Sequence, residues 1–221
     1  NNINDTAPSI TSSNTFTADE NQTEIGTVTA TDTDSDDSSI TFSITGSDIS
    51  INSSSGVITF NSAPNYESTN SYSATVSATD GTNTTTQNIT VNINDINDAP
   101  VTTSKAYWAR LLPQSQTTST WSLEGVSDED GDTLTYSIVS NGTYGTASVN
   151  SSSGVVSYVT AASTQSTVTD TFTYKVNDGT SDSNTATITL ESRTDPLYQY
   201  QWHLNNTGQT NFATNAGTSG A

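Results

Sequence analysis

Residues 94–100 read Asn-Asp-Ile-Asn-Asp-Ala-Pro, and this short stretch decides how the rest of the chain is organised. Two carboxylates, Asp95 and Asp98, flank Asn97, and Pro100 closes the segment. Proline fixes its own backbone angle and favours an extended residue before it, so we expect a stiff connector rather than a helix. Carboxylate and backbone oxygens along such a connector are the ligands that a hard divalent cation prefers.

Several phrases of the sequence occur twice, at a spacing of about one domain length. Residues 2–8, Asn-Ile-Asn-Asp-Thr-Ala-Pro, nearly repeat the connector at the start of the chain. Residues 51–60 are echoed by residues 149–158, and Asp80-Gly-Thr is echoed by Asp178-Gly-Thr. This self-similarity predicts two copies of one fold, each preceded by a short linker.

Apolar residues alternate with Ser, Thr and Asn within each copy, which is typical of antiparallel strands with one solvated face. In the first copy the alternating residues are Ile40, Phe42 and Ile44, then Tyr72, Ala74, Val76 and Ala78, then Ile89, Val91 and Ile93. Turn signals such as Ser55-Gly56 and Asp80-Gly81 separate these runs. Short strands at this spacing favour a β-sandwich over a barrel or a βαβ fold.

The chain is strongly acidic, with 4 Lys and Arg against 23 Asp and Glu, a formal charge of −19. This balance excludes a nucleic-acid partner, because phosphate binding needs basic stripes. A salt-rich habitat or a disordered chain would also be acidic, but the patterned apolar residues argue against disorder. With no cysteine, disulfides and thiolate metal sites are excluded, although an extracellular module can use calcium instead.

No apolar run in the sequence is long enough to span a bilayer, and we expect no signal peptide within these residues. Methionine is absent and the chain opens within a linker phrase, so we expect a piece of a longer polypeptide.

Acidic clusters precede strands or occupy turns in both copies. They are Asp32-Thr-Asp34 and Asp80 in the first copy, and residues 128–132 and Asp178 in the second. Because the loops of a sandwich gather at its two ends, such acids can converge at one pole. Convergence without cations would be costly, since like charges repel. Calcium accepts about six to eight oxygen ligands of mixed type, which suits this arrangement.

These motifs carry a family resemblance. The first copy resembles a cadherin repeat through Glu20-Asn21, Asp32-Thr-Asp34, Tyr66-Glu67, Ala78-Thr-Asp80 and residues 95–100. The second is similar to the cadherin-like tandem modules of large bacterial surface and secreted proteins, through residues 127–134 and 172–179. The resemblance implies an all-β fold of two tandem Greek-key, Ig-like β-sandwiches with an irregular C-terminal tail. The expected divisions are a linker at 1–8, a first domain at 9–100 with its calcium linker at 94–100, a second domain at 101–193 and a tail at 194–221.

The resemblance also implies a calcium site at the junction between the repeats. Its ligands would be Glu20, Glu67, Asp95, Asn97, Asp98, Asp128, Asp130 and Asp178. A comparable half-site at the chain start would use Asn4, Asp5, Asp32, Asp34 and Asp80. The chain departs from the family pattern at Asn65 and Asn2, where aspartate is common, so fewer or weaker ions are expected.

Residues 195–209, Asp-Pro-Leu-Tyr-Gln-Tyr-Gln-Trp-His-Leu-Asn-Asn-Thr-Gly-Gln, resemble the segment that opens the catalytic domain of subtilisin-like serine proteases, especially the kexin-like branch. None of that family's catalytic residues carries over, because its Asp, His and Ser motifs lie beyond this segment. His203 is therefore expected to be structural, and the chain is not expected to be an enzyme. A glycosidase pair of carboxylates is disfavoured, because the acids lie on linkers and turns rather than in a cleft.

Residues 105–113 contain Tyr107, Trp108, Leu111 and Leu112 and allow two interpretations. They form either a first strand whose aromatic side chains pack on the sandwich, or an exposed contact patch for a glycan or a partner protein.

The sequence thus predicts a calcium-binding, non-catalytic, extracellular module that acts as a rigid spacer, adhesion or assembly unit of a bacterial surface or secreted protein. One alternative is an accessory region of a secreted subtilisin-like serine protease. Another is a subunit of a self-assembling extracellular filament, since exposed strand edges can pair with further copies.

Overall fold

A computed structural model describes residues 6–33, 40–108, 118–161 and 169–191, apart from the side chain of Trp108. Every element among these residues is a β-strand. The chain divides into two compact units, residues 1–96 and 97–221. Each unit is described by itself.

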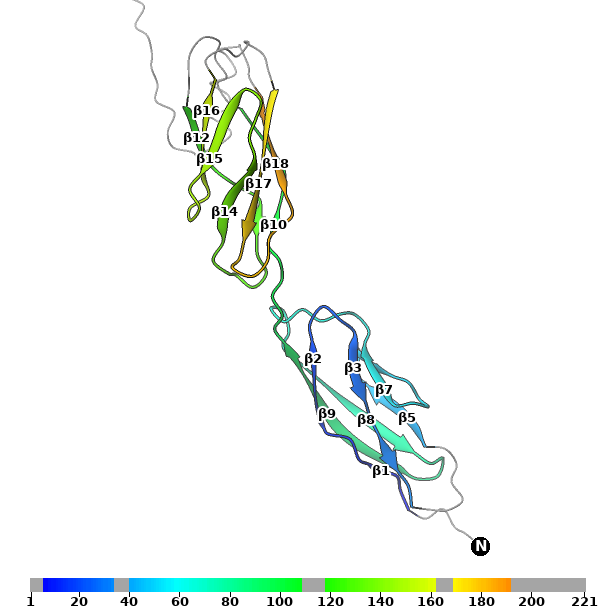
Figure 1. Cartoon of the computed structure of the whole chain (residues 1–221). Coiled ribbons are helices and arrows are strands. Elements are labelled where there is room, and N and C mark those ends of the chain that lie inside the picture. The colour runs from blue at the N-terminus through cyan, green and yellow to red at the C-terminus, as the bar shows by residue number, and fades with distance from the viewer. Residues whose placement is uncertain (1–5, 34–39, 109–117, 162–168, 192–221) are drawn as a thin grey trace, which may run out of the picture. The chain divides into compact units, whose positions relative to one another are not determined.

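The first unit packs a four-stranded sheet, β2-β9-β8-β5, against a three-stranded sheet, β3-β7-β6, with a short β1-β4 pair beside them (Figure 1). Its strands are β1 (Ser9–Ile10), β2 (Thr15–Asp19), β3 (Glu24–Thr27), β4 (Ala30–Thr31), β5 (Thr41–Thr45), β6 (Ile49–Ile51), β7 (Val57–Phe60), β8 (Ser71–Thr79) and β9 (Thr84–Asn94). All the pairs are antiparallel except β2 and β9, which run parallel with Thr15 opposite Thr90.

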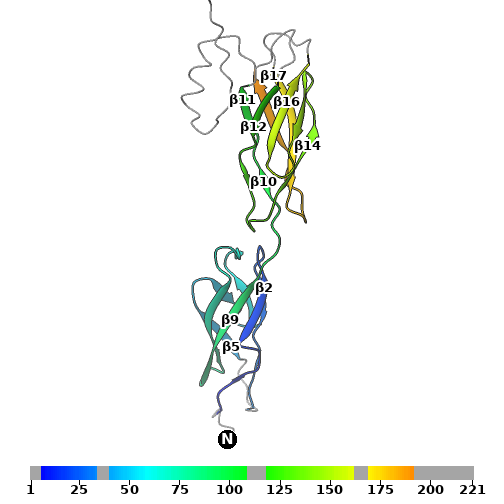
Figure 2. The same ribbon diagram turned by 90° about the vertical axis from the view of Figure 1, so that its left-hand side faces the viewer.

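The second unit repeats this topology strand for strand (Figure 2). Its sheets are β11-β18-β17-β14, β12-β16-β15 and β10-β13, and β11 and β18 again form a parallel pair. Its strands are β10 (Val101–Thr102), β11 (Lys105–Trp108), β12 (Thr118–Ser122), β13 (Val126–Ser127), β14 (Thr135–Ser140), β15 (Gly145–Val149), β16 (Val155–Thr160), β17 (Thr169–Asn177) and β18 (Ala186–Glu191). The structure therefore confirms the all-β fold and the two copies that the repeated phrases predict.

The predicted alternation of apolar and polar residues builds each core. In β8 and β9, the residues that point inward include Val76, Ala78, Ile89 and Val91, each at most 1% exposed. Their neighbours along the strands are Ser, Thr and Asn, which lie on the outer face. Burying one face of two packed sheets is what stabilises a sandwich of this size.

The repeated Asn-Ser-Ser-Ser-Gly phrase forms the same turn in both units. The side-chain oxygen of Asn52 accepts hydrogen bonds from the backbone N–H groups of Ser54 and Ser55. In the second unit, that of Asn150 accepts them from Ser152 and Ser153. The turns end at Gly56 (φ 71°) and Gly154 (φ 65°), a left-handed conformation that favours glycine.

Tyr107 lies on β11, half-buried against the core of the second unit, with its ring 5.5 Å from the ring of Trp121. This side chain follows the first-strand interpretation of residues 105–113. The side chain of Trp108 and residues 109–117 lie outside the described residues. Within the described part of the chain, no helix is long and apolar enough to cross a membrane.

Candidate metal centres

Glu20 is a buried acid of the first unit that is held on both carboxylate oxygens. It directly follows β2, and its side chain is only 3% exposed. One carboxylate oxygen accepts the backbone N–H of Tyr66 at 2.7 Å, and the other accepts the N–H of Ile96 at 2.9 Å. A buried carboxylate held by two N–H donors is fixed in position, and it fixes the connector at Ile96 in turn.

Two further carboxylates gather at Glu20. Glu67 and Asp95 each place one oxygen within 4.8 Å of an oxygen of Glu20 and of each other. The turn that carries Glu67 is held by Asn65, whose side-chain oxygen accepts the N–H of Ser68 at 2.9 Å. Three carboxylates at this spacing repel one another unless a cation neutralises them.

The second unit has its own cluster in the loop after β13. Asp128, Asp130 and Asp132 each offer a carboxylate oxygen, and these oxygens lie within 4.8 Å of one another. The loop closes tightly because Asp132 donates its backbone N–H to Asp128 at 2.9 Å, and Gly131 adopts a left-handed φ of 73°. Oδ2 of Asp128 and Oδ1 of Asp130 are buried and have no hydrogen-bond partner within the described residues. Buried oxygens of this kind fit a bound cation.

The end of the connector is attached to this second cluster. Asp98 donates its backbone N–H to Oδ2 of Asp130 at 2.7 Å, and its carboxylate lies within 4.8 Å of that of Glu129. The side-chain amide of Asn97 donates to Oδ2 of Asp178 at 3.0 Å.

Asp178 opens the turn between β17 and β18. Its Oδ1 accepts the N–H groups of Thr180 and Ser181, each at 2.6 Å. The pKa of Asp178 is lowered, chiefly because the N–H of Ser181 and the amide of Asn97 donate to the carboxylate. Asp178 therefore stays ionised, as a cation ligand must be.

The predicted half-site at the chain start is only partly described. Asp80 is 2% exposed and accepts the N–H groups of Thr82 and Asn83 at 2.7 Å, in the same kind of turn as Asp178. Asp32 is half-buried, and neither of these two acids belongs to an acidic cluster of the described residues. Asn4, Asp5 and Asp34 lie outside the described residues.

Two acids of the clusters, Glu129 and Asp132, were not among the predicted ligands. Both belong to the phrase Asp128-Glu-Asp-Gly-Asp132. The regular spacing of its three aspartates around a glycine is the signal that would have found Asp132, since alternate acids in a tight loop can share one cation.

The matches to protein families follow the two units closely. Residues 14–94 match the cadherin domain family, and residues 97–193 match the bacterial cadherin-like domain family. The chain contains two tandem cadherin-like domains. Neither family is an enzyme family, and neither match extends past residue 193, so the predicted resemblance of residues 195–209 to a protease lies outside both matches and outside the described residues.

Solved cadherin structures share the fold of this pair of domains. Human protocadherin-24 EC1-2 is 16% identical with a TM-score of 0.56, over 87% of this chain and 100% of that one. Mouse cadherin-23 EC22-24 is 23% identical with a TM-score of 0.52, over 86% of this chain and 65% of that one. Protocadherin gammaB7 EC3-6, in a cis-dimer, is 23% identical with a TM-score of 0.52, over 86% of this chain and 53% of that one.

The chain thus spans about half the length of the first protocadherin structures that it matches, at 53% of each. At these identities the likeness concerns the fold alone. No curated protein matches the chain.

Proposed function

We propose that the two cadherin-like domains form a calcium-dependent extracellular spacer, in which calcium binds between the acidic cluster at Glu20 and the cluster at Asp128–Asp132. The observation that carries the proposal is the attachment of the connector at both ends. Ile96 is hydrogen-bonded to Glu20 of the first domain, and Asp98 is hydrogen-bonded to Asp130 of the second.

Chain continuity supports a shared site. Ile96 and Asp98 are two residues apart, and two residues of extended chain span at most about 7 Å. The carboxylates that hold these residues are therefore tethered near one another by covalent structure alone. Calcium takes about six to eight oxygens at about 2.3–2.6 Å, more than the described acids of either domain supply with one oxygen each.

The donor set suits calcium better than other metals. The ligands proposed are carboxylates, the side-chain oxygen of Asn97 and backbone carbonyls, and the described residues contain no histidine or cysteine. Hard oxygen ligands favour calcium and magnesium, and an irregular set with several carboxylates suits the flexible coordination of calcium. The ligands proposed at this junction are Glu20, Glu67, Asp95, Asn97, Asp98, Asp128, Asp130 and Asp178, together with Glu129 and Asp132.

Bound calcium would act by neutralising carboxylates that otherwise repel across the connector. Without the ion, this repulsion favours conformations in which the two domains separate about residues 95–98. With the ion, both ends of the connector are fixed and the hinge becomes stiff. An affinity in the range of extracellular modules, with a Kd of about 10⁻⁴–10⁻³ M, would make the stiffness depend on conditions outside the cell.

The test is thermal and chemical unfolding together with small-angle X-ray scattering, first in chelator and then in roughly 10 mM calcium. Linkage predicts a gain of about 1.4–2.7 kcal/mol in the free energy of unfolding for one site of the above affinity, and a narrower distribution of particle lengths. If calcium changes neither quantity, the acids are only a solvated surface.

A matched pair of variants locates the site. Asp130→Asn removes one charge from the cluster and is expected to weaken calcium binding about tenfold or more. Asp48→Asn removes the same charge from an exposed loop, where the carboxylate accepts a hydrogen bond from Ser47, and it should bind calcium as the parent chain does. Equal losses in both variants would mean that net charge, not a built site, attracts the ion.

The biological role of a stiff spacer depends on what it carries. Adhesion predicts calcium-dependent clumping of cells or beads that display the chain, and filament assembly predicts high-mass particles by light scattering. The role as accessory region of a secreted protease rests on residues 195–209, and it predicts proteolytic activity in the parent polypeptide and none in residues 1–193.

A further inference from the structure

The outward positions of β5, β8 and β9 in the first domain carry no charge, although the chain as a whole has a formal charge of −19. The exposed Asp19 lies on the same face, at the end of the neighbouring strand β2. In β5, β8 and β9, the outward positions are all Ser, Thr or Asn. They are Thr41, Ser43 and Thr45, then Ser71, Ser73, Thr75, Ser77 and Thr79, then Thr84, Thr86, Asn88, Thr90, Asn92 and Asn94. An ionic ligand would find no counter-charge on these three strands, so this part of the face suits a neutral partner rich in hydrogen-bonding groups.

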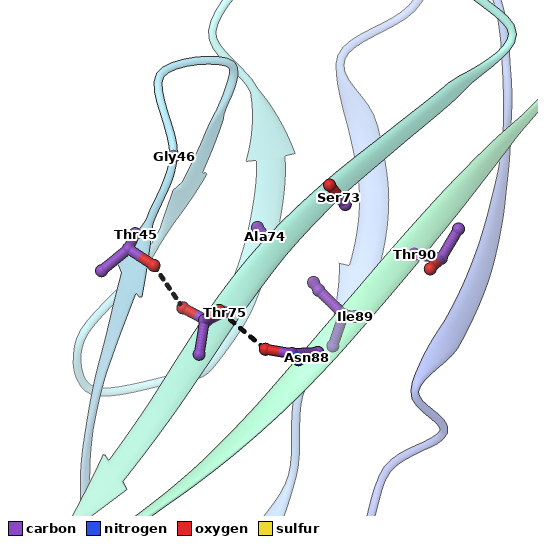
Figure 3. Close-up of a pocket in the computed structure, with 8 residues that line it drawn as sticks. All are labelled: Thr45, Gly46, Ser73, Ala74, Thr75, Asn88, Ile89 and Thr90. Atoms are coloured by element: carbon purple, nitrogen blue, oxygen red, sulfur yellow. Dashed lines mark hydrogen bonds between the residues drawn. The ribbon is translucent and has the colours of Figure 1, made fainter.

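The face is hollowed where β5 ends (Figure 3). The hollow has a volume of about 470 Å³, and it is lined by Thr45, Gly46, Ser73, Ala74, Thr75, Asn88, Ile89 and Thr90. Gly46 contributes no side chain, and the nearest atom to an added Cβ would be the methyl group of Ala74 at 3.7 Å. The hollow is shallow and open to solvent, so a bound molecule would keep part of its surface in water.

The polar groups of the hollow are oriented by one another. Thr45 donates its hydroxyl to the backbone oxygen of Thr75 at 3.3 Å, and Thr75 donates its own hydroxyl to Oδ1 of Asn88 at 2.8 Å (Figure 3). This chain of donors leaves the amide NH₂ of Asn88 directed away from Thr75. Ser73 and Thr90 lie directly opposite each other on β8 and β9, next to this pair. The result is a small array of donors and acceptors at cross-strand spacing.

The corresponding place in the second domain differs. Thr173 lies opposite Thr187 there, so the amide of Asn88 has no counterpart. Ser140 follows a bulge in β14, and Asn141 stands next in the chain where the first domain has Gly46. Lys175 and Glu191 also bring charges to the same sheet. The hollow is therefore a feature of the first domain.

We infer that this hollow binds an uncharged sugar, of the size of a short oligosaccharide. Vicinal hydroxyls of a sugar match neighbouring hydroxyl and amide groups, because each hydroxyl both donates and accepts. No aromatic ring lines the hollow, so the contact rests on hydrogen bonds exchanged with water and is weak, with a Kd on the order of 10⁻³ M. The inference does not depend on calcium, since no acid lines the site.

The experiment is a titration of the ¹⁵N-labelled chain, followed by amide chemical shifts, with maltotriose, cellotriose and mannotriose, and with trigalacturonate as the charged counterpart. We expect saturable shifts at residues 45–46, 73–75 and 88–90 with at least one neutral trisaccharide, unchanged by chelator, and none with trigalacturonate. If no neutral sugar shifts these amides, or if the shifts lie elsewhere, the inference is wrong.

Two substitutions at outward positions make the test specific. Asn88→Ala removes the oriented amide and should weaken binding about five- to tenfold. Thr187→Ala, at the equivalent position of the second domain, should leave the affinity unchanged. A sugar response that Asn88→Ala leaves intact, or that Thr187→Ala abolishes, would overturn the assignment.

Discussion

The two domains place different pairs of side chains at one equivalent position between their strands. At equivalent positions on the two strands that follow the repeated turn, the first domain has Phe60 and Tyr72, whose rings meet edge to face with centroids 5.0 Å apart. The second domain has Tyr158 and Asp170, joined by a hydrogen bond from the phenol to the carboxylate. One topology thus accommodates either an apolar contact or a buried charge.

The buried charge requires more of its surroundings. Asp170 is 3% exposed and also accepts backbone N–H groups from Thr143 and Tyr144 at 2.8 Å and from Thr171 at 2.9 Å. Gly142 packs so closely on this carboxylate that an added Cβ would collide with it. The comparison teaches that a polar residue at a core position is tolerated when a whole loop supplies its donors.

The largest expected effect comes from removing that charge. Asp170→Ala leaves the phenol of Tyr158 and several N–H groups buried without their acceptor, so the free energy of unfolding of the second domain should fall by about 3–5 kcal/mol. All 3 tryptophans of the chain lie beyond residue 97, so the fluorescence change in urea follows the second domain.

The control for this prediction is Asp182→Ala. Asp182 is exposed and forms a surface ion pair with Lys175, which contributes about 1 kcal/mol or less. Similar losses in the two variants would show that Asp170 does not anchor the loop.

Alkaline pH should lower the free energy of unfolding of the second domain by an amount comparable to the loss in Asp170→Ala. Burial raises the pKa of Tyr174 to about 12, and burial together with the hydrogen bond to Asp170 raises the pKa of Tyr158. Folded pKa values above the unfolded value mean that stability is complete below about pH 10 and is lost as the pH rises through the folded pKa.

We therefore expect the urea midpoint of the second domain, followed by tryptophan fluorescence, to fall steadily above pH 10. Tyr174→Phe removes one of the titrating groups and should reduce the slope. Identical slopes for the variant and the parent chain would contradict the assignment to Tyr174.

A smaller loss is expected when the loop around Asp170 is crowded. Gly142→Ala forces the carboxylate or the loop to shift, at a cost of about 1–3 kcal/mol in urea denaturation. Thr146→Ala, at an exposed position of β15, is the matched substitution and should change stability by about 0.5 kcal/mol or less. Equal stability of the two variants would contradict the prediction, because it would show that the loop accommodates the added methyl group without strain.

The smallest effect is expected from making the second domain more like the first. Tyr158→Phe keeps the ring next to Phe172, whose centroid lies 6.1 Å away, and removes only the phenol donor. Because Asp170 retains its backbone donors, the loss should be about 1 kcal/mol. A double-mutant cycle with Asp170→Ala measures the coupling directly, and a coupling near zero would mean that the hydrogen bond contributes nothing.

Much of the fold could be predicted from the sequence. Alternation in residues 40–44, 72–78 and 89–93 gave strands that the structure confirms, because one face of each is buried. The repeated phrases predicted two copies, and the identical strand order follows from that. The parallel pairing of β2 with β9 could not be read from local pattern, since alternation is the same for parallel and antiparallel neighbours.

The candidate site was predictable only in part. The acidic linker and turns indicated cation ligands, but the two backbone bonds that hold Glu20 depend on where a distant turn and the connector arrive in space. The burial of Asp170 could have been predicted from its place in the strand pattern. It occupies the inward phase of a strand shared with Phe172, Tyr174 and Val176, where a charge must find buried donors.

The parallel pairing of β2 with β9 and of β11 with β18 has a mechanical consequence. In each domain, β2 and β9, or β11 and β18, run side by side in the same direction, so the chain enters near one end of the pair and leaves near the other. A pull on the two ends therefore loads the hydrogen bonds of the pair in shear, and they must break together rather than one at a time. Each sandwich is therefore expected to resist unfolding when its two ends are pulled apart.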